Sequence, residues 1–436
     1  MTGSSPPMPT ETRRARQRWT IIVTSTGGAL ETFDVVVYGF FAQEIGRAFF
    51  PASAGLSTVT LSFAVFALGF LARPLGGIFF GHLGDRYGRR RVFAWSAIVA
   101  ALSTLLIAIL PAYRMWGAAA PFLLLALRLT QGFCVGGELP GAIVYAVETA
   151  RMKPGFSCGI VFFAVNMALL LAVGINLVEQ RTLTPAQIDT FGWRIGFLAG
   201  GVIGLFSFLL RRTLPETDAY ARAGDAREQK PLSVLLRDYR GPIAVGMVAS
   251  MLVGLSNGLI VTHAPAWLRL LHYEPQRIAA AQTLHVVAIS ACMLLIAHIG
   301  DVLPRRYLFR AGAVLSALFA PVFYLTLARH QADLRVIFLI AAVVASFANG
   351  TFACAIAELF PVGVRYSGVA MAINIGLGTS MGVAPLAANV LIARTGWMAA
   401  PALLLVFGAA LAFVASFGMR QLVYGKEGAL CRLKVR

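Results

Sequence analysis

Long apolar stretches recur along almost the whole chain, and they constrain the fold more than any other feature. A helix needs about 20 apolar residues to cross a hydrocarbon core about 30 Å thick. Twelve stretches meet this requirement, at 20–45, 56–80, 92–111, 119–147, 156–178, 193–210, 242–266, 278–299, 307–328, 334–357, 367–392 and 398–419. The sequence therefore predicts an all-α integral membrane protein with twelve transmembrane helices.

The composition supports this prediction. Of the 436 residues, 58% are hydrophobic and 13% are charged, and the mean hydropathy is +0.75. Soluble domains carry about 25% charged residues, so a soluble globule of this composition could not cover its surface with polar groups. The net charge is +18, but the basic residues are scattered between apolar runs and form no continuous basic face. Soluble, disordered and nucleic-acid-binding classes are therefore excluded.

The sequence gives no sign of metal or covalent chemistry. Its five cysteines are odd in number and form no CxxC pair, which argues against a disulfide framework or a zinc site. We also find no constellation of a nucleophile with a base, and no metal-ligand spacing. We therefore expect neither an enzyme nor a bound cofactor or metal.

Basic residues indicate how the spans are oriented. Lys and Arg occur nearly three times as often on one side of the predicted spans as on the other, which marks that side as cytoplasmic. With an even number of spans both termini lie in the cytoplasm, and we expect no removable signal peptide. The predicted organisation is a cytoplasmic tail at 1–18, a six-helix bundle at 19–210, a cytoplasmic linker at 211–241, a second six-helix bundle at 242–420 and a cytoplasmic tail at 421–436.

A loop motif is repeated in the two halves. The loop after the second span is Gly81-His-Leu-Gly-Asp-Arg-Tyr-Gly-Arg-Arg-Arg91, and the loop after the eighth span is Gly300-Asp-Val-Leu-Pro-Arg-Arg306. The weaker copy stands at the matching place in the second half, which indicates an internal repeat of six-span units. Two parallel halves with a site between them near the midplane are typical of secondary transporters.

The first of these loops resembles the signature loop of the major facilitator superfamily. More narrowly, six segments of the chain resemble the metabolite:proton symporter family. They are Glu31-Thr-Phe-Asp34 with Tyr38-Gly-Phe, Arg73-Pro-Leu-Gly-Gly77, Arg128-Leu-Thr-Gln-Gly-Phe-Cys-Val-Gly-Gly-Glu138, Gly192-Trp-Arg-Ile195, Leu214-Pro-Glu-Thr217 and Glu358-Leu-Phe-Pro-x-x-x-Arg-Tyr-Ser-Gly368. The chain departs from the family at Thr32 and Val35, where aromatic residues are frequent, and in the weak second loop. The resemblance implies proton-coupled transport of a small metabolite by alternating access, and we expect a monomer.

Ionisable residues inside the predicted spans need a functional explanation, because each costs at least about 2.5–3.5 kcal/mol. Glu31, Asp34 and Tyr38 lie on one stripe of the first span, and Arg128 and Gln131 share a stripe of the fourth. Asp34 and Arg128 fall at comparable depths in the membrane. We therefore expect a direct ion pair between these two residues, with Glu31 nearby.

Such a pair predicts proton coupling. An anionic substrate that binds the arginine would remove the partner of the aspartate, and the carboxylate would then take up a proton. The alternative is a static ion pair that ties two spans together. The expected proton-coupling residues are Glu31 and Asp34, and the expected substrate-binding residues are Arg128, Gln131, Tyr38 and Asn374.

By resemblance, the signature loop closes the cytoplasmic side. Asp85 can accept hydrogen bonds from a helix N-terminus or pair with an arginine in one conformation only, while the alternative is that the loop arginines merely anchor the topology. Glu138 either lines the cytoplasmic half of the path or binds a neighbouring helix end, and Glu148 and Glu358 are either latch partners or solvated helix ends. The expected gating residues are Gly81, Asp85, Arg86, Gly88, Arg89, Glu138, Glu148 and Glu358.

The sequence thus predicts a proton symporter that imports a small organic anion, such as a citrate-like di- or tricarboxylate, across the cell inner membrane. Arg128 favours a carboxylate substrate because a guanidinium can hold one through two hydrogen bonds. One alternative is a proton symporter of a zwitterionic osmolyte such as proline or betaine. Another is a membrane sensor that keeps the fold without transport. The expected partners are the metabolite, the proton and the lipid bilayer.

Overall fold

The chain is almost entirely helical in the computed structural model, which describes residues 10–50, 58–150, 153–223, 231–419, 423–424 and 430–431. Eleven helices, or unbroken series of helices, in these ranges are long and apolar enough to cross a membrane. α1 (Thr10–Phe40) adds a twelfth long helix, which begins with the basic segment 10–18 and continues through the first predicted span. The predicted all-α fold with twelve spans is confirmed.

The first half of the chain begins with α1 and continues to α9. The remaining elements of this half are α2 (Ala42–Phe49), α3 (Thr58–Tyr87), α4 (Arg89–Ile109), α5 (Tyr113–Trp116), α6 (Ala119–Thr149), α7 (Pro154–Thr182), α8 (Pro185–Gln187), the π-helical η1 (Ile188–Gly192) and α9 (Trp193–Arg211). Two short helices, α10 (Asp218–Ala223) and α11 (Pro231–Asp238), follow in the linker.

In the second half, two of the spans contain π-helical stretches. The elements are α12 (Arg240–Ser256), η3 (Asn257–His263), α13 (Ala264–Leu270), α14 (Pro275–Ile299), α15 (Arg305–Ala328), α16 (Leu334–Ala357), η4 (Val362–Val364), α17 (Arg365–Ile373), η5 (Asn374–Gly378), α18 (Thr379–Thr395), α19 (Pro401–Ala415) and η6 (Ser416–Gly418). A short antiparallel pair of strands, β1 (Val423–Tyr424) and β2 (Leu430–Cys431), follows.

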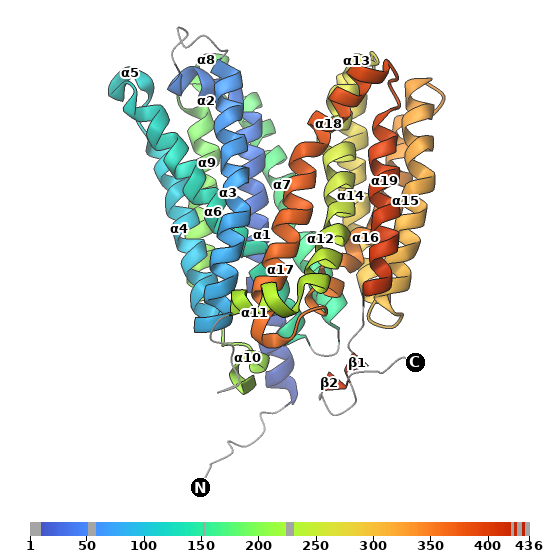
Figure 1. Cartoon of the computed structure of the whole chain (residues 1–436). Helices are drawn as coiled ribbons and strands as arrows, with labels where there is room; N and C mark the ends of the chain where they lie inside the picture. Colours follow the sequence, from blue (N-terminus) through green and yellow to red (C-terminus); the bar gives the residue numbers. More distant parts are fainter. Residues whose placement is uncertain are drawn as a thin grey trace.

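The first apolar stretch, predicted as one span over 20–45, divides into two helices. α1 ends at Phe40, and α2 lies at the end of the bundle near α8 (Figure 1). The buried residues of α2 are Ala42, Ile45, Gly46 and Phe49. This spacing places them on one helix face, with Glu44 and Arg47 on the other, so α2 covers the end of the bundle instead of extending the span.

Two helical bundles stand side by side, one made of α1–α9 and the other of α12–α19 (Figure 1). Contacts between the bundles are made by α17 with α3 and α6, and by α14 with α7. The ribbons of the two bundles converge toward α10 and α11 and diverge toward α5 and α13 (Figure 1). We call the end that carries α10 and α11 the linker face.

Within the first bundle, α3 and α6 approach so closely that the contact requires glycine. A Cβ atom on Gly132 would lie 1.9 Å from the carbonyl oxygen of Gly69, and one on Gly136 would lie 2.1 Å from that of Arg73. The Gly132-x-x-x-Gly136 spacing therefore permits the backbone contact between these helices. As a result, Arg73 of α3 and Arg128 of α6 line the same pocket.

Candidate functional site

A buried polar network connects α1, α4 and α6 in the first bundle. The Asp34 Oδ2 atom accepts hydrogen bonds from Thr104 Oγ1 at 2.6 Å and from Gln131 Nε2 at 2.8 Å. The other end of the Gln131 amide, Oε1, accepts a hydrogen bond from Arg128 Nη1 at 2.6 Å. These four side chains are all buried. The amide of Gln131 therefore stands between the carboxylate and the guanidinium.

The predicted direct pair between Asp34 and Arg128 is thus replaced by a bridge, since the described ion pairs do not join these two residues. The Arg128 guanidinium lies over the Tyr38 ring, with its central carbon 3.7 Å from the ring centroid. Phe197 and Phe66 are at 5.6 and 5.8 Å. Aromatic faces attract a desolvated cation by about 2 kcal/mol or more, so the arginine can be buried without touching a carboxylate.

Part of the hydrogen-bonding capacity of this network is unused. Arg128 Nε and Nη2 and Asp34 Oδ1 are buried and have no hydrogen-bond partner among the described residues. All three atoms belong to side chains that line one pocket, together with Phe66, Phe70 and Arg73. Buried donors and acceptors are normally satisfied, so these atoms mark a place where a charged ligand can bind.

Not all of the sequence-predicted residues reach this pocket. Arg128 and Gln131 line it. The Tyr38 ring instead packs against the Arg128 guanidinium, and the Tyr38 hydroxyl donates to the Ser62 carbonyl oxygen at 3.0 Å. Asn374 lies elsewhere, because its amide donates to the Gly136 carbonyl oxygen at 2.8 Å and so joins η5 to α6. Glu31 belongs to α1, but its side chain lies outside the described part of the structure.

Thr104, Phe66 and Phe197 were not predicted from the sequence as site residues. Each is one of many similar residues in an apolar span, and nothing in its spacing distinguishes it. Arg73 stands out in the sequence as a charge within a predicted span, although no role was predicted for it. Only the packing of α3, α4 and α9 against α1 and α6 brings these residues to the network.

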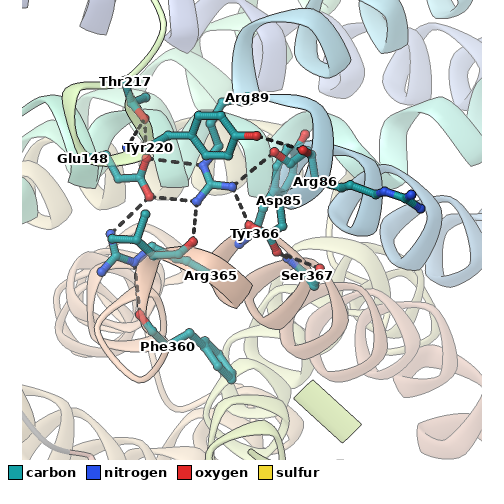
Figure 2. Close-up of polar contacts among 12 residues, drawn as sticks. Asp85, Arg86, Arg89, Glu148, Thr217, Tyr220, Phe360, Arg365, Tyr366 and Ser367 are labelled. Carbon is teal, nitrogen blue, oxygen red and sulfur yellow. Dashed lines mark hydrogen bonds and ion pairs between the residues drawn. The ribbon is translucent and has the colours of Figure 1, made fainter. Parts of the chain in front are cut away.

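At the linker face, a second polar network joins the two halves (Figure 2). Asp85, at the end of α3, accepts hydrogen bonds from the backbone amides of Tyr366 at 3.1 Å and Ser367 at 2.8 Å. The Ser367 hydroxyl donates to Asp85 as well, at 2.7 Å. A carboxylate is thus placed at the N-terminus of α17, where amides without helical partners and the helix dipole favour negative charge.

Arginines continue this network from both halves. Arg89 pairs with Asp85 and with Glu148, the latter at 3.0 Å, and Arg365 reaches Glu148 from the second half at 3.2 Å. The linker contributes Thr217, whose hydroxyl donates to Glu148 at 2.6 Å. Figure 2 shows Glu148 between the two arginines. We call Asp85, Arg89, Glu148 and Arg365 the first cluster.

The glycines and Arg86 of the signature loop have separate structural tasks. Gly88 has φ +110°, which permits the tight connection between α3 and α4. A Cβ atom on Gly81 would lie 2.8 Å from Ser367 Cα, so this glycine permits close contact with α17. The Arg86 side chain is exposed over Tyr87, while its carbonyl oxygen accepts a hydrogen bond from Tyr220 of the linker at 3.0 Å.

Glu138 does not reach the contact between the halves. It pairs with Arg211 of α9 at 2.6 Å and accepts a hydrogen bond from Ser96 of α4 at 2.5 Å. All three residues belong to the first bundle. Of the two alternatives from the sequence, binding to a neighbouring helix end describes its position, and the structure gives it no gating contact among the described residues.

A second cluster lies where α14 meets α7. Asp301 accepts hydrogen bonds from the backbone amides of Gly155 at 2.7 Å and Phe156 at 2.8 Å, so it caps the N-terminus of α7 from the opposite half. Arg305 binds Asp301 at 2.7 Å and also pairs with Glu358. We call Asp301, Arg305 and Glu358 the second cluster. It involves the repeated loop and is the counterpart of the first cluster.

Comparisons with known proteins agree with this architecture. The sequence model of the Major Facilitator Superfamily matches residues 21–372. The proline/betaine transporter of Salmonella typhimurium is 30% identical, over 93% of this chain and 83% of that protein. A putative proline/betaine transporter of Staphylococcus aureus is 31% identical, over 88% of this chain and 84% of its own. Among solved structures, the proton:xylose symporter XylE superposes with a TM-score of 0.78 at 18% identity, covering 93% of this chain and 96% of the other.

Proposed function

The chain belongs to the major facilitator superfamily and is a multi-pass secondary transporter, and from this premise we propose that it imports a small zwitterionic carboxylate together with protons. The proline/betaine transporters among its relatives support a solute of the proline or betaine type. They do not support the citrate-like substrate expected from the sequence. A zwitterionic osmolyte is therefore the leading candidate substrate.

One observation carries the proposal: the Arg128 guanidinium lines the same pocket as Asp34, and its Nε and Nη2 atoms have no hydrogen-bond partner within the described part of the chain. Two parallel N–H donors suit a single carboxylate, which a guanidinium holds as a fork. Phe66 and Phe70 also line the pocket, and aromatic rings can attract a secondary or quaternary ammonium. A carboxylate at the arginine and a cation against the phenylalanines describe a zwitterion.

Asp34 is proposed to carry the proton. Its Oδ1 atom has no hydrogen-bond partner among the described residues, so a proton can be added there without breaking the bonds that Oδ2 accepts from Thr104 and Gln131. The carboxylate of the solute replaces part of the negative charge that Asp34 offers to Arg128. Solute and proton then bind favourably together, and both cross when the transporter changes conformation.

Orientation follows from the basic residues. We infer that the linker face is cytoplasmic, because the segments predicted on that side of the inner membrane carry most of the Lys and Arg. The two clusters then close the cytoplasmic side, and the diverging ends of the bundles face outward (Figure 1). Import requires both clusters to open after the solute has bound.

A second candidate substrate is an organic anion, and Arg73 favours it. This arginine lines the same pocket as Arg128, so two guanidinium groups border the space. A dicarboxylate could bind one group at each end, whereas a zwitterion needs only one. Citrate-like acids therefore remain the alternative to osmolytes.

Transport by purified protein in proteoliposomes distinguishes these substrates. With an inward proton gradient, we expect accumulation of labelled L-proline or glycine betaine, and collapse of that accumulation when a protonophore is added. Counterflow should show the same solute preference without a gradient. Accumulation of citrate or succinate in preference to both osmolytes would contradict the proposal and favour the anion.

Asp34→Asn tests the coupling separately. We expect concentrative uptake to fall to background while counterflow exchange of the same solute continues, because exchange needs no net proton movement. Asp333→Asn is a matched control, since Asp333 caps α16 outside this pocket. Full concentrative uptake by Asp34→Asn would remove Asp34 from the coupling role.

A further inference from the structure

We propose that Gln131 is a positioning residue that keeps Arg128 and Asp34 apart, so that the guanidinium stays available to the carboxylate of the solute. The inference rests on the transport function proposed above. It reverses the role that the sequence suggests for Gln131, because the amide serves the arginine instead of binding the solute.

The orientation of the Gln131 amide is determined by its two partners. A carboxylate can only accept hydrogen bonds and a guanidinium can only donate them. The Nε2 end therefore faces Asp34 at 2.8 Å and the Oε1 end faces Arg128 at 2.6 Å. The reversed amide would place oxygen against oxygen and nitrogen against nitrogen, so the bridge has a single stable direction.

Thr104 fixes the same amide from a third helix. Gln131 Nε2 lies 2.6 Å from Thr104 Oγ1, and the threonine hydroxyl is itself within 3.0 Å of the Ala100 carbonyl oxygen. The amide nitrogen thus has two acceptors, one on α1 and one on α4. Because Gln131 is only 3% exposed, it is held by packing as well as by hydrogen bonds.

Without this amide, the two charged groups would be free to meet. Opposite charges attract far more strongly in a poorly solvated interior than in water, and the arginine side chain is long enough to change rotamer. A direct ion pair would use the guanidinium donors Nε and Nη2, which have no partner in the ranges that the structure describes. The solute would then have to break an ion pair before it could bind.

Support from the aromatic rings makes the spaced arrangement possible. The Tyr38 ring lies 3.7 Å from the guanidinium carbon of Arg128, so the cation is stabilised where it stands. A buried arginine without such a surface would need the carboxylate directly. The site therefore combines an aromatic support that holds the cation with an amide that keeps the anion one side chain away.

Gln131→Leu tests the inference, since leucine keeps the approximate volume and removes the amide. Binding of L-proline and glycine betaine is measured by isothermal titration of the purified transporter in lipid nanodiscs. We expect Gln131→Leu to bind both solutes about tenfold more weakly than wild type, or worse. Gln180→Leu is the control for the same chemical change, because Gln180 is exposed and its amide donates only to Asn176 among described residues. It should leave binding unchanged.

The double variant separates a spacer from a ligand-binding residue. In the background of Asp34→Asn there is no carboxylate for the arginine to meet, so adding Gln131→Leu should change affinity by less than about threefold. A tenfold loss that persists in this background would show that Gln131 binds the solute, and it would overturn the inference. Unchanged affinity of the single variant Gln131→Leu would overturn it as well.

A second measurement needs no solute at all. The structure of Gln131→Leu is determined without ligand, and we expect an Arg128 nitrogen to lie within ion-pair distance, about 4 Å, of an Asp34 oxygen. Separated groups in that structure would overturn the inference. If the wild-type protein binds neither proline nor betaine, the proposed function fails, whereas this distance still decides the role of Gln131.

Discussion

Asp85 and Asp301 occupy equivalent places in the two halves, yet their surroundings differ. Each carboxylate accepts hydrogen bonds from two consecutive backbone amides at the start of a helix in the other half. Asp85 also accepts a bond from the Ser367 hydroxyl, whereas the corresponding position beside Asp301 is Phe156. The capping contact is repeated in both clusters, but the side-chain donor is present only in the first.

When the two caps are aligned, Pro154 is the residue equivalent to Arg365. Arg365 binds Glu148 across the halves, and a proline has no side-chain donor with which to do the same for Glu358. The first cluster balances two acids with two arginines, while the described residues of the second balance two acids with Arg305 alone. Closure of the linker face therefore depends more on the first cluster than on the second.

Removing the charge of each aspartate gives the largest expected effect and tests this asymmetry directly. Asp85→Asn loses an ion pair and the favourable interaction of a negative charge with the N-terminus of α17. Together these contribute about 2–3 kcal/mol. We expect the ratio of open to closed linker faces to rise about thirtyfold or more. Asp301→Asn should shift it in the same direction by a smaller factor. Pulsed electron resonance distances between spin labels attached at positions 91 and 307 would report both populations.

Asp333→Asn is the matched control for these two variants. Asp333 also caps a helix, since its carboxylate accepts from the amides of Arg335 and Val336, but both helix and cap lie in one half. Asp333→Asn should leave the distribution of distances between the two spin labels unchanged. Equal shifts for Asp85→Asn and Asp301→Asn would contradict the asymmetry, and no shift for either would leave the loops with only a topological role.

A steric change gives the next largest effect. A Cβ atom on Gly84 would lie 2.1 Å from the Tyr366 ring, whereas one on Gly155 would lie 2.7 Å from Asp301 and from a backbone oxygen of Ala297. Overpacking at such buried contacts costs about 1–3 kcal/mol. Gly84→Ala should therefore open the linker face, and Gly155→Ala should do so to a lesser extent.

Alkylation of a cysteine introduced on the buried side of this contact would follow the opening as a rate. Gly174→Ala controls for the loss of glycine flexibility, because a Cβ atom there meets nothing within 4 Å. A faster rate in Gly155→Ala than in Gly84→Ala would reverse the proposed order of the two clusters.

The sequence predicted the architecture well because hydrophobic length and the distribution of Lys and Arg are local signals. It also identified both repeated loops, although it gave Asp301 no role. The boundary between α1 and α2 could not be predicted from hydropathy, since the stretch over 20–45 is apolar on both sides of the break. The amphipathic spacing of the residues after Phe41 is the signal that could have indicated a separate helix.

The charged residues of the candidate site could be predicted from the sequence, but the contacts between their side chains could not. Asp34 and Arg128 stand out because charge is costly inside a membrane. Their separation by Gln131 depends on side-chain geometry, and the support from Tyr38 depends on how α1 packs beside α6. Glu138 was assigned to gating on its position along α6, but its partner Arg211 lies on a helix distant in sequence.

The smallest expected effect concerns one hydroxyl group. Ser367→Ala removes the side-chain donor of the first cluster and keeps both backbone amides, so the first cap becomes similar to the second. One hydrogen bond to a charged acceptor contributes about 1.5–3 kcal/mol at most, and the remaining amides can compensate in part. We expect about a fivefold rise in the open-to-closed ratio, measured with the same spin labels.

The reciprocal change at position 156 tests whether the missing hydroxyl accounts for the weaker second cluster. Phe156→Ser alone is ambiguous, because it also removes the edge-to-face contact of Phe156 with His298. Phe156→Ala removes the same contact, so the difference between these two variants isolates the oxygen atom. If a hydroxyl on the third residue of the capped helix strengthens closure, Phe156→Ser should be more closed than Phe156→Ala, by a factor similar to that between wild type and Ser367→Ala. Equal populations in the two variants would mean that the asymmetry arises from Arg365 and Pro154, and not from the serine.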